Sequence, residues 1–192
     1  MNRRIAFVRR NVNRAAVIRH IFVSPGHNFF GRHQLPAGAH AARDVASAIG
    51  RAGWGLEGDR FYGYRPEYKG QITFFAWETV VAARREFGVP ALGADVFRRN
   101  VIVEGLDLAA LVGVRFSLGG LVFDGIEESR PCHWMNQVVA PGAEDWLRGR
   151  GGLRAKIASD GELRVGPTEL RLLQEATRPL PPLRKPPLSS IK

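Results

Sequence analysis

Short apolar runs, each stopped after a few residues by glycine or proline, restrict this chain to a small set of folds. Runs rich in β-branched and aromatic residues predict strands at 16–24, 43–49, 71–76, 96–103, 114–118, 121–128, 153–159, 162–165 and 169–173. Gly119-Gly120 and Asp160-Gly161 each separate two of these runs and predict hairpins. Helices are expected only at 78–87 and, shorter, at 143–150. The pattern predicts a mainly β protein with a few helices (α+β), whose strands close or nearly close into a barrel.

Length and charge distribution predict one folded domain between two basic ends. The chain has 192 residues, of which 45% are hydrophobic and 24% charged, as in ordinary globular proteins. Its formal net charge of +10 comes from residues 1–20 and 176–192, which hold basic side chains and no acidic ones. We therefore expect a basic N-terminal arm at 1–15, a domain at 16–175 and a proline-rich basic tail at 176–192. Because the domain is formally neutral, nucleic-acid binding is not favoured.

Cysteine usage and hydropathy indicate the compartment. Cys132 is the only cysteine, so no internal disulfide can form and a reducing setting is expected. No apolar run is long enough to span a membrane, and residues 1–15 lack the apolar stretch of a secretory signal. We predict a cytoplasmic protein without a membrane partner.

Cys132 occupies a sequence position that favours a functional role. It follows the predicted strand 121–128 and then Pro131, which has no N–H to give to a sheet, so the strand should end there. The thiol is therefore expected in a turn between Arg130 and His133, whose positive charge would favour the nucleophilic, metal-binding thiolate. The alternative is a small buried hydrophobic side chain, and the sequence weighs the two evenly.

Other catalytic and cofactor patterns are sparse. Adjacent side chains seldom face each other, so His27 or His33, arriving from another strand, would serve Cys132 as a base better than His133. No second cysteine provides zinc spacing, and no phosphate-binding loop is present. Residues 53–58 match a dinucleotide-binding glycine pattern in spelling only, because no clear strand and helix flank them. No flavin or iron–sulfur motif appears, so electrons would have to come from a separate protein.

Four stretches in order resemble the MOSC domain, which is named for the C-terminal domain of molybdenum cofactor sulfurase. They are residues 55–60 (Gly-Leu-Glu-Gly-Asp-Arg), 97–105 (Phe-Arg-Arg-Asn-Val-Ile-Val-Glu-Gly), 129–132 (Ser-Arg-Pro-Cys), and 152–157 with 161–166. Residues 21–31 are similar to the start of small stand-alone members of this family. The resemblance covers about residues 16–174 and implies a MOSC-type, β-barrel-like single domain.

The resemblance implies chemistry of the molybdenum cofactor (molybdopterin) or of sulfur. In relatives that bind the cofactor, the motif cysteine is a thiolate ligand of molybdenum, and the arginine-asparagine segment holds the pterin. Carried over, Cys132 would bind the metal, while Arg99 and Asn100 would contact the pterin or its phosphate. A soft thiolate suits such a metal centre, and the planar fork of arginine suits a phosphate. The other residues implied are Asn28, Asp59, Arg60, Arg130 and Lys156 as cofactor contacts, and His27 and His133 as catalytic groups beside Cys132.

Each assignment has a plainer alternative. Arg98 and Arg99 could belong to a solvated strand edge, and Asn100 could cap a turn. Asp59 and Arg60 could form only an internal ion pair, and Lys156 could be a surface base. If the cofactor assignments hold, the structure should place Arg99 and Asn100 in one pocket with Cys132, with His27 or Asn28 at its rim.

Three functions remain open. The first is a molybdenum-dependent reductase of N-hydroxylated small molecules, served by a separate electron donor. The second is a sulfur or cofactor carrier that holds a persulfide on Cys132 and is loaded by a sulfur donor protein. The third is a non-catalytic, basic-tailed binding module. The larger cofactor-binding relatives have an extra N-terminal β-barrel domain, so binding here could be weaker or could use a homodimer partner. Pyridoxal phosphate is not expected, because no lysine has a suitable context.

Overall fold

The computed structural model describes residues 13–28, 38–65 and 67–174, which are built mainly of strands. The strands are β1 (Asn13–Val23), β2 (Arg43–Asp44), β3 (Ser47–Arg51), β4 (Gly55–Leu56), β5 (Ile72–Ala76), β6 (Val101–Glu104), β7 (Arg115–Leu118), β8 (Leu121–Glu128), β9 (Leu153–Ile157), β10 (Gly161–Arg164) and β11 (Gly166–Gln174). The helices are α1 (Trp77–Glu86), α2 (Trp134–Val138) and α3 (Ala143–Trp146), with 3-10 turns at Ala94–Phe97 and Ala109–Leu111.

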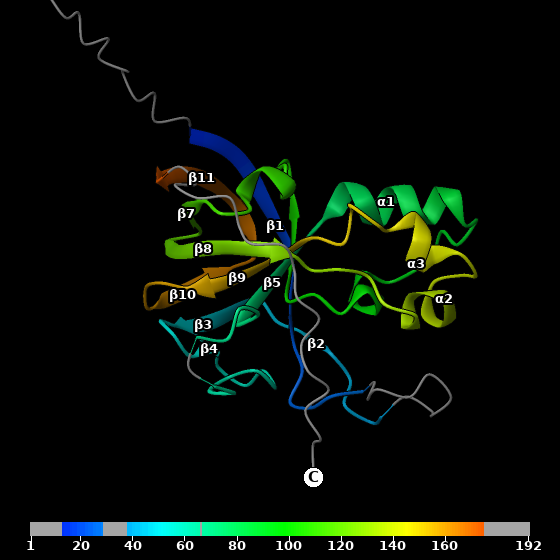
Figure 1. The fold of residues 1–192 in the computed structure, drawn as a ribbon, viewed down its shortest axis with the longest axis horizontal. Coiled ribbons are helices and arrows are strands. Elements are labelled where there is room, and N and C mark those ends of the chain that lie inside the picture. The colour runs from blue at the N-terminus through cyan, green and yellow to red at the C-terminus, as the bar shows by residue number, and fades with distance from the viewer. Residues whose placement is uncertain (1–12, 29–37, 66, 175–192) are drawn as a thin grey trace, which may run out of the picture.

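Seven strands form a closed ring in the order β11-β7-β8-β9-β5-β6-β1, and β1 closes it by pairing with β11 (Figure 1). A closed ring leaves no unpaired sheet edge, which is how a chain of many short strands can bury its backbone. The predicted fold class, a mainly β (α+β) barrel, is confirmed.

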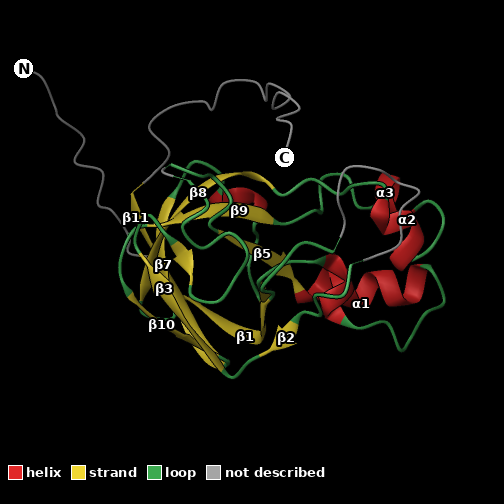
Figure 2. Ribbon diagram, turned by 90° about the horizontal axis from the view of Figure 1, so that it is seen from below, coloured by secondary structure: helices red, strands yellow, loops and turns green. Residues whose placement is uncertain are grey.

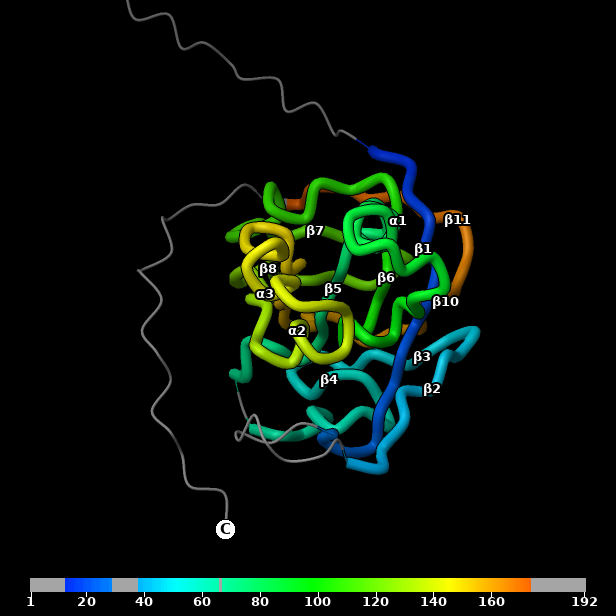
Figure 3. The backbone as a smooth tube through the Cα atoms, turned by 90° about the vertical axis from the view of Figure 1, so that its right-hand side faces the viewer, coloured from blue at the N-terminus to red at the C-terminus, as the bar shows by residue number. Residues whose placement is uncertain are grey.

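The helices gather at one end of the barrel. Neighbours in the ring are antiparallel except β5 and β6, which are parallel and therefore need a long crossover, here containing α1. Figures 1 and 2 show α1, α2 and α3 on one side of the strands, and Figure 3 looks onto that end. The chain passes from β5 into α1 and from β8 toward α2, so the loop carrying Cys132 lies at this end.

Two apolar cores hold the fold together. Inside the barrel, buried and half-buried residues alternate along β8, and the ring of Phe74 contacts those of Phe116 and Phe123 at centroid distances of 6.0 and 5.2 Å. A second core joins the barrel to the helices, where Phe75 stacks on Phe97 at 4.6 Å. Phe74 and Phe75 serve different cores because successive strand residues point to opposite faces.

One predicted hairpin, spanning residues 153–165, is wrong. β9 pairs with β8 and β5 in the barrel, whereas β10 pairs with β3 in a separate sheet of order β10-β3-β4. The Asp160 carboxylate accepts hydrogen bonds from the Ala52 N–H at 2.8 Å and from Arg51 at 3.3 Å. Asp160 thus ties this segment to the end of β3 instead of closing a two-residue turn. The other predicted hairpin forms around Gly119-Gly120, with β7 antiparallel to β8.

Several element boundaries also differ from prediction. β1 begins at Asn13, whose partner is Arg171, so residues 13–15 of the predicted arm belong to the barrel. The predicted strand 43–49 is divided into β2 and β3, and the predicted strand 96–103 is a 3-10 turn followed by β6. The sequence does not predict α2, and α3 ends at Trp146. The remainder of the arm, the tail, and His33 with its neighbours at 29–37 lie outside the described residues.

Among the described residues, no helix combines the length and the apolar character needed to cross a membrane.

Candidate functional site

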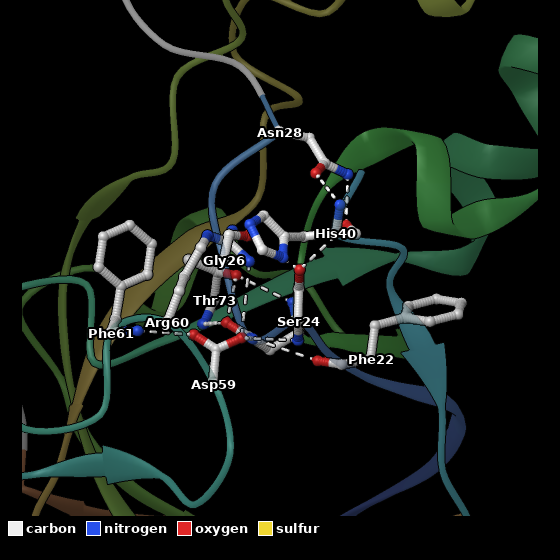
Figure 4. A network of polar contacts seen from close by, with 10 residues as sticks. Phe22, Ser24, Gly26, Asn28, His40, Asp59, Arg60, Phe61 and Thr73 are labelled. Atoms are coloured by element: carbon white, nitrogen blue, oxygen red, sulfur yellow. Dashed lines mark hydrogen bonds and ion pairs between the residues drawn. The ribbon is translucent and has the colours of Figure 1, made fainter. Parts of the chain in front are cut away.

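Several predicted site residues converge where β1 ends and β6 begins. Asp59 is almost fully buried and lies at the centre of the polar network drawn in Figure 4. Its Oδ2 accepts hydrogen bonds from the Ser24 N–H at 3.3 Å and from Asn100 Nδ2 at 3.1 Å, and its Oδ1 accepts one from the Phe61 N–H at 3.1 Å. A buried carboxylate persists only when it is paired in this way. Asp59 therefore joins three segments that are distant in sequence.

The Asn100 side chain is fully engaged with the protein. Its Oδ1 accepts hydrogen bonds from the N–H and the hydroxyl of Thr73, at 3.1 and 2.9 Å. Its Nδ2 donates to the Phe22 carbonyl at 3.2 Å and to Asp59. These contacts link β1, β5 and the turn before β6, which is a positioning role; direct contact of Asn100 with a cofactor stays a prediction.

A pocket of about 250 Å3 opens beside this network, and a recess of about 20 Å3 continues from it. The walls that the two share are formed by Ser24, Ala42, Arg60, Asp95 and Arg98. Asn28 and His40 line the larger part, whereas Arg99 and Asn100 line the recess. The structure therefore brings the predicted residues Asn28, Arg60, Arg99 and Asn100 to two adjoining cavities that share walls. Cys132, which was predicted to share their pocket, is not among the residues that line either cavity.

Arg60 is the least satisfied cation in this pocket wall. Its Nη1 lies 3.6 Å from Asp59 Oδ2, and its guanidinium carbon lies 4.9 Å from the centre of the Phe61 ring. Its Nε is buried and has no hydrogen-bond partner within the described part of the chain. An unsatisfied buried donor costs about 1–3 kcal/mol, so an acceptor supplied by a ligand would be stabilised there.

Arg98 joins the pocket to the cysteine. It has left-handed backbone angles, φ 59° and ψ 40°, at the end of the 3-10 turn, a conformation that non-glycine residues seldom adopt. Burial lowers the pKa of Arg98, and the charge of Arg60 lowers it further, whereas a hydrogen bond and charge attraction with Cys132 act in the opposite direction. Arg98 therefore lines the cavity and contacts the thiol, a role that the sequence reading did not assign to it.

The Cys132 thiol is exposed, so the alternative of a buried hydrophobic side chain is wrong. Its residue lies between Pro131 and α2, and its carbonyl accepts the Met135 N–H at 2.9 Å. Among the described residues, no three His, Cys, Asp or Glu side chains gather closely enough to hold a metal ion. Cys132 is therefore available as one ligand of a metal that arrives with its own ligands, or as an acceptor of sulfur.

Arg99 points away from the solvated strand edge suggested as its plainer role. Its guanidinium donates hydrogen bonds to four backbone carbonyls, those of Phe97, Ser129, Arg130 and Gly151. Burial lowers the pKa of Arg99 to about 9; the nearby charges of Arg154, Arg98 and Arg60 also lower it, and Cys132 opposes them. The side chain is thus a part-buried cation beside the cysteine loop.

Asn28 and His40 are bonded to each other at the pocket rim. The Asn28 side chain accepts the His40 N–H at 2.7 Å and donates to the His40 carbonyl, and the Gly38 N–H donates to the Asn28 carbonyl at 2.7 Å. The Ser24 hydroxyl reaches the same His40 carbonyl at 3.3 Å. Asn28 therefore shapes the pocket rim through backbone contacts.

The two predicted catalytic histidines occupy different surroundings. The His27 ring packs edge-on against the Phe61 ring, with the ring centroids 5.0 Å apart. The charges of Arg60 and Arg98 act on His27, so it lies near the cavity. His133 Nδ1 instead lies 4.0 Å from a carboxylate oxygen of Glu144, so its recorded ion pair is with α3. Catalytic roles for both remain predictions.

Lys156 and Arg130 lie outside the pocket walls. Lys156 is on β9 and forms an ion pair with Glu67, which agrees with its plainer role as a surface base. Arg130 is exposed, and its recorded contacts use its backbone: the carbonyl accepts Arg99 Nη2 at 3.4 Å, and the N–H donates to the Glu128 carbonyl at 3.0 Å. Neither residue lines the described cavity.

The His27 environment predicts a pH dependence of stability. Burial, then the charges of Arg60 and Arg98, lower the pKa of His27 below its ordinary value of 6.5. In the unfolded chain His27 therefore binds a proton more readily than in the folded chain. The stability that neutral His27 contributes to the fold is complete above pH 6.5 and is lost as the pH falls toward the pKa of His27 in the folded protein. We expect His27→Gln to reduce the drop in melting temperature between pH 7 and 5 by about 1–2 °C, the side chain being partly exposed. His133→Gln is the control, and an equal drop in both variants would contradict the assignment.

Some pocket residues were not predicted. Ser24 lies in the stretch 21–31 that resembles the start of small MOSC proteins, but no role was predicted for it. His40 lies in none of the motif stretches, and for Arg98 only the solvated strand edge was considered. The doubled Arg98-Arg99 signal could have suggested two different roles. A left-handed residue between a 3-10 turn and a strand cannot, however, be recognised from local pattern when it is not glycine.

Comparisons with known proteins agree with the fold. The family model for the MOSC domain matches residues 40–170. No curated protein sequence matches the chain.

Solved structures share the fold. The YuaD protein from Bacillus subtilis is similar with a TM-score of 0.69 and 18% sequence identity, covering 86% of this chain and 100% of its own. YiiM from Geobacillus stearothermophilus has a TM-score of 0.62 and 19% identity, covering 86% of this chain and 78% of its own. YiiM from Escherichia coli has a TM-score of 0.57 and 18% identity, covering 81% and 71%.

Proposed function

Because the chain belongs to the MOSC domain family, we propose that it binds the molybdenum cofactor in the arginine-lined pocket, with Cys132 as the thiolate ligand of the metal. The observation that carries this proposal is the contact between the exposed Cys132 thiol and Arg98, a residue of the pocket wall. The contact places a soft ligand and a cation for an anionic group side by side.

The residues present fit such a group. Arg60 and Arg98 would hold the phosphate, because both line the pocket and the Nε of Arg60 lacks an acceptor among the described residues. Asp59 and Asn100 would support the pocket without contacting the ligand, since their polar atoms already bond to the protein and hold the pocket segments together. The volume of about 250 Å3 is small for a whole pterin cofactor, so part of the ligand would extend over the open rim.

The finer proposal is reduction of N-hydroxylated small molecules. The bound cofactor would supply two-electron transfer, so that the N–O bond breaks, two protons are taken up, and an amine and water leave. Cys132 would hold the metal, Arg98 would balance the charge of its sulfur, and His27, neutral at pH 7, would accept or donate a proton at the rim. The two electrons would come from a separate donor protein, which the exposed position of Cys132 leaves able to approach. We place this activity in the cytoplasm.

Sulfur carriage is the second candidate. It is favoured by a thiol that is both exposed and next to a cation, which is the setting of a reactive cysteine. Here Cys132 would accept a sulfane sulfur from a persulfide donor and pass it on, with the donor thiol as the leaving group. A separate sulfur donor protein would then take the place of the electron donor.

Metal and sulfur analysis of the full chain tests both candidates. The protein would be produced in a host that makes the cofactor, and molybdenum, pterin and cyanide-releasable sulfur would be measured per chain. We expect molybdenum and pterin in equal amounts, reduced about tenfold or more in Arg98→Ala because a cation that contacts both ligand and thiol is lost.

Arg148→Ala is the matched control, because Arg148 is exposed and, among the described residues, pairs locally with Asp145. Sulfur without molybdenum would establish the carrier function instead. Neither molybdenum nor sulfur in the wild-type chain, or equal loading of the two arginine variants, would overturn the proposed site.

A further inference from the structure

Arg99 lines the small recess of the cavity, yet its guanidinium donates all of its described hydrogen bonds to backbone carbonyls. Its Nε donates to the Gly151 carbonyl at 3.0 Å and its Nη1 to the Phe97 carbonyl at 3.0 Å. Its Nη2 donates to the carbonyls of Ser129 at 2.5 Å and Arg130 at 3.4 Å. One side chain thus joins three segments: the end of the 3-10 turn, the loop after β8, and the residues before β9.

Backbone hydrogen bonds hold the loop after β8 at its two ends. The Ser129 N–H donates to the Gly152 carbonyl at 2.8 Å, and the Arg130 N–H donates within its own turn to Glu128. Pro131 has no N–H to contribute. The Cys132 carbonyl then accepts a backbone bond from α2. Between these points, the guanidinium of Arg99 bonds the carbonyls of Ser129 and Arg130 and so fastens the backbone just before the thiol.

We propose that Arg99 is a positioning residue that fixes the Cys132 loop against the pocket, and that it is not itself a contact of the bound cofactor. The inference deepens the proposed function, on which its relevance to cofactor binding rests. Arg98, one residue earlier, lines both parts of the cavity and contacts the thiol, so the doubled arginine divides two tasks between neighbours.

A substitution by lysine can distinguish the role of the positive charge of Arg99 from the role of its planar set of donors. Only a planar group with several donors in fixed directions can reach carbonyls on three segments at once. Lysine keeps the positive charge but presents one compact ammonium group. A phosphate contact would therefore be partly preserved in Arg99→Lys, whereas a backbone clamp would be lost.

Amide hydrogen exchange and thiol labelling of the full chain, produced without cofactor, test this division. In Arg99→Lys we expect exchange of residues 129–133 to become about tenfold faster or more, and the rate of Cys132 labelling by iodoacetamide at one fixed pH to change about threefold or more, as expected for local opening. Gln71→Leu is the matched control: Gln71 is buried and also clamps backbone, bonding the Gly53 carbonyl and the Ile157 N–H. It should lower the melting temperature while leaving Cys132 labelling within about twofold of the wild-type rate.

Every outcome decides the question. Unchanged exchange at 129–133 in Arg99→Lys, or equal changes in Cys132 labelling in both variants, would overturn the positioning role. If Arg99→Lys does not fold, Arg99→Gln is measured in the same way, and loss of the fold in both shows that Arg99 holds the whole barrel rather than this loop. Because the readouts need no cofactor, the clamp can stand even where the wild-type chain carries no molybdenum, and that result would refute the proposed function alone.

Discussion

Cys132→Ser is expected to lower molybdenum loading, or persulfide loading, about tenfold or more while the melting temperature stays within about 2 °C of wild type. Serine is close to cysteine in size, but its hydroxyl is far less acidic and is a poor ligand for a soft metal. The thiol is exposed, so its replacement removes little packing. Metal analysis, cyanide-releasable sulfur and a thermal melt of both proteins measure the three quantities.

A second substitution tests whether the missing thiolate alone explains the reduced loading. Cys132→Ala should behave like Cys132→Ser in loading, because neither side chain offers a thiolate. A serine variant that keeps its metal, or that melts far below the wild-type protein, would refute the assigned role of Cys132.

Gly152→Ala is expected to lower the free energy of unfolding by about 3 kcal/mol or more, the largest effect on stability that we predict. Gly152 has φ +88°, which L-residues with a Cβ rarely adopt. A Cβ there would lie 2.1 Å from the carbonyl oxygen of Phe74, and this oxygen belongs to strand backbone that cannot simply rotate away. Both the conformation and the contact oppose the substitution. Urea unfolding followed by circular dichroism measures the difference.

Gly149→Ala is the matched control. Gly149 also has a positive φ, +75°, but an added Cβ would meet no heavy atom within 4 Å. It should therefore show only the conformational cost, about 1 kcal/mol. Similar losses at the two positions would show that the close approach of Gly152 to Phe74 is not what matters.

The Gly152 variant also bears on the site. The Gly152 carbonyl accepts a hydrogen bond from the Ser129 N–H at 2.8 Å, and the carbonyl of the neighbouring Gly151 accepts one from Arg99 Nε. The glycine pair therefore allows the chain before β9 to approach both β5 and the cysteine loop. Any Gly152→Ala protein that still folds should label Cys132 at an altered rate, whereas Gly149→Ala should not.

Local sequence pattern was sufficient to predict the barrel, and the motifs were sufficient to identify the family. Strand periodicity, the turn at Gly119-Gly120 and the helix beginning near residue 78 are short-range signals, and the structure contains all three. The motif resemblance also led correctly to the family. Cys132 lies in the loop after the strand, as predicted, although β8 ends at Glu128 and not at Pro131.

Local sequence pattern could not predict which strands pair when they are distant in sequence. The Asp160-Gly161 pair has the sequence of a hairpin turn, yet the Asp160 side chain bonds to Ala52, which is 108 residues away, and β10 pairs with β3. A local turn preference is worth little when distant backbone donors compete for the same carboxylate.

The amino-acid sequence by itself predicted a mainly β chain, closed or nearly closed into a barrel, with one thiol in a turn, because strand period, glycine and proline act within a few residues; the motif resemblance indicated the MOSC family. Only the tertiary structure decided how two adjacent arginines divide their work. Arg99 reaches carbonyls 30 and 52 residues away, at Ser129 and Gly151, while Arg98 turns through a left-handed conformation toward the pocket and Cys132. Both are the same residue type in the same motif, so their difference lies in which distant groups the folded chain brings to each side chain.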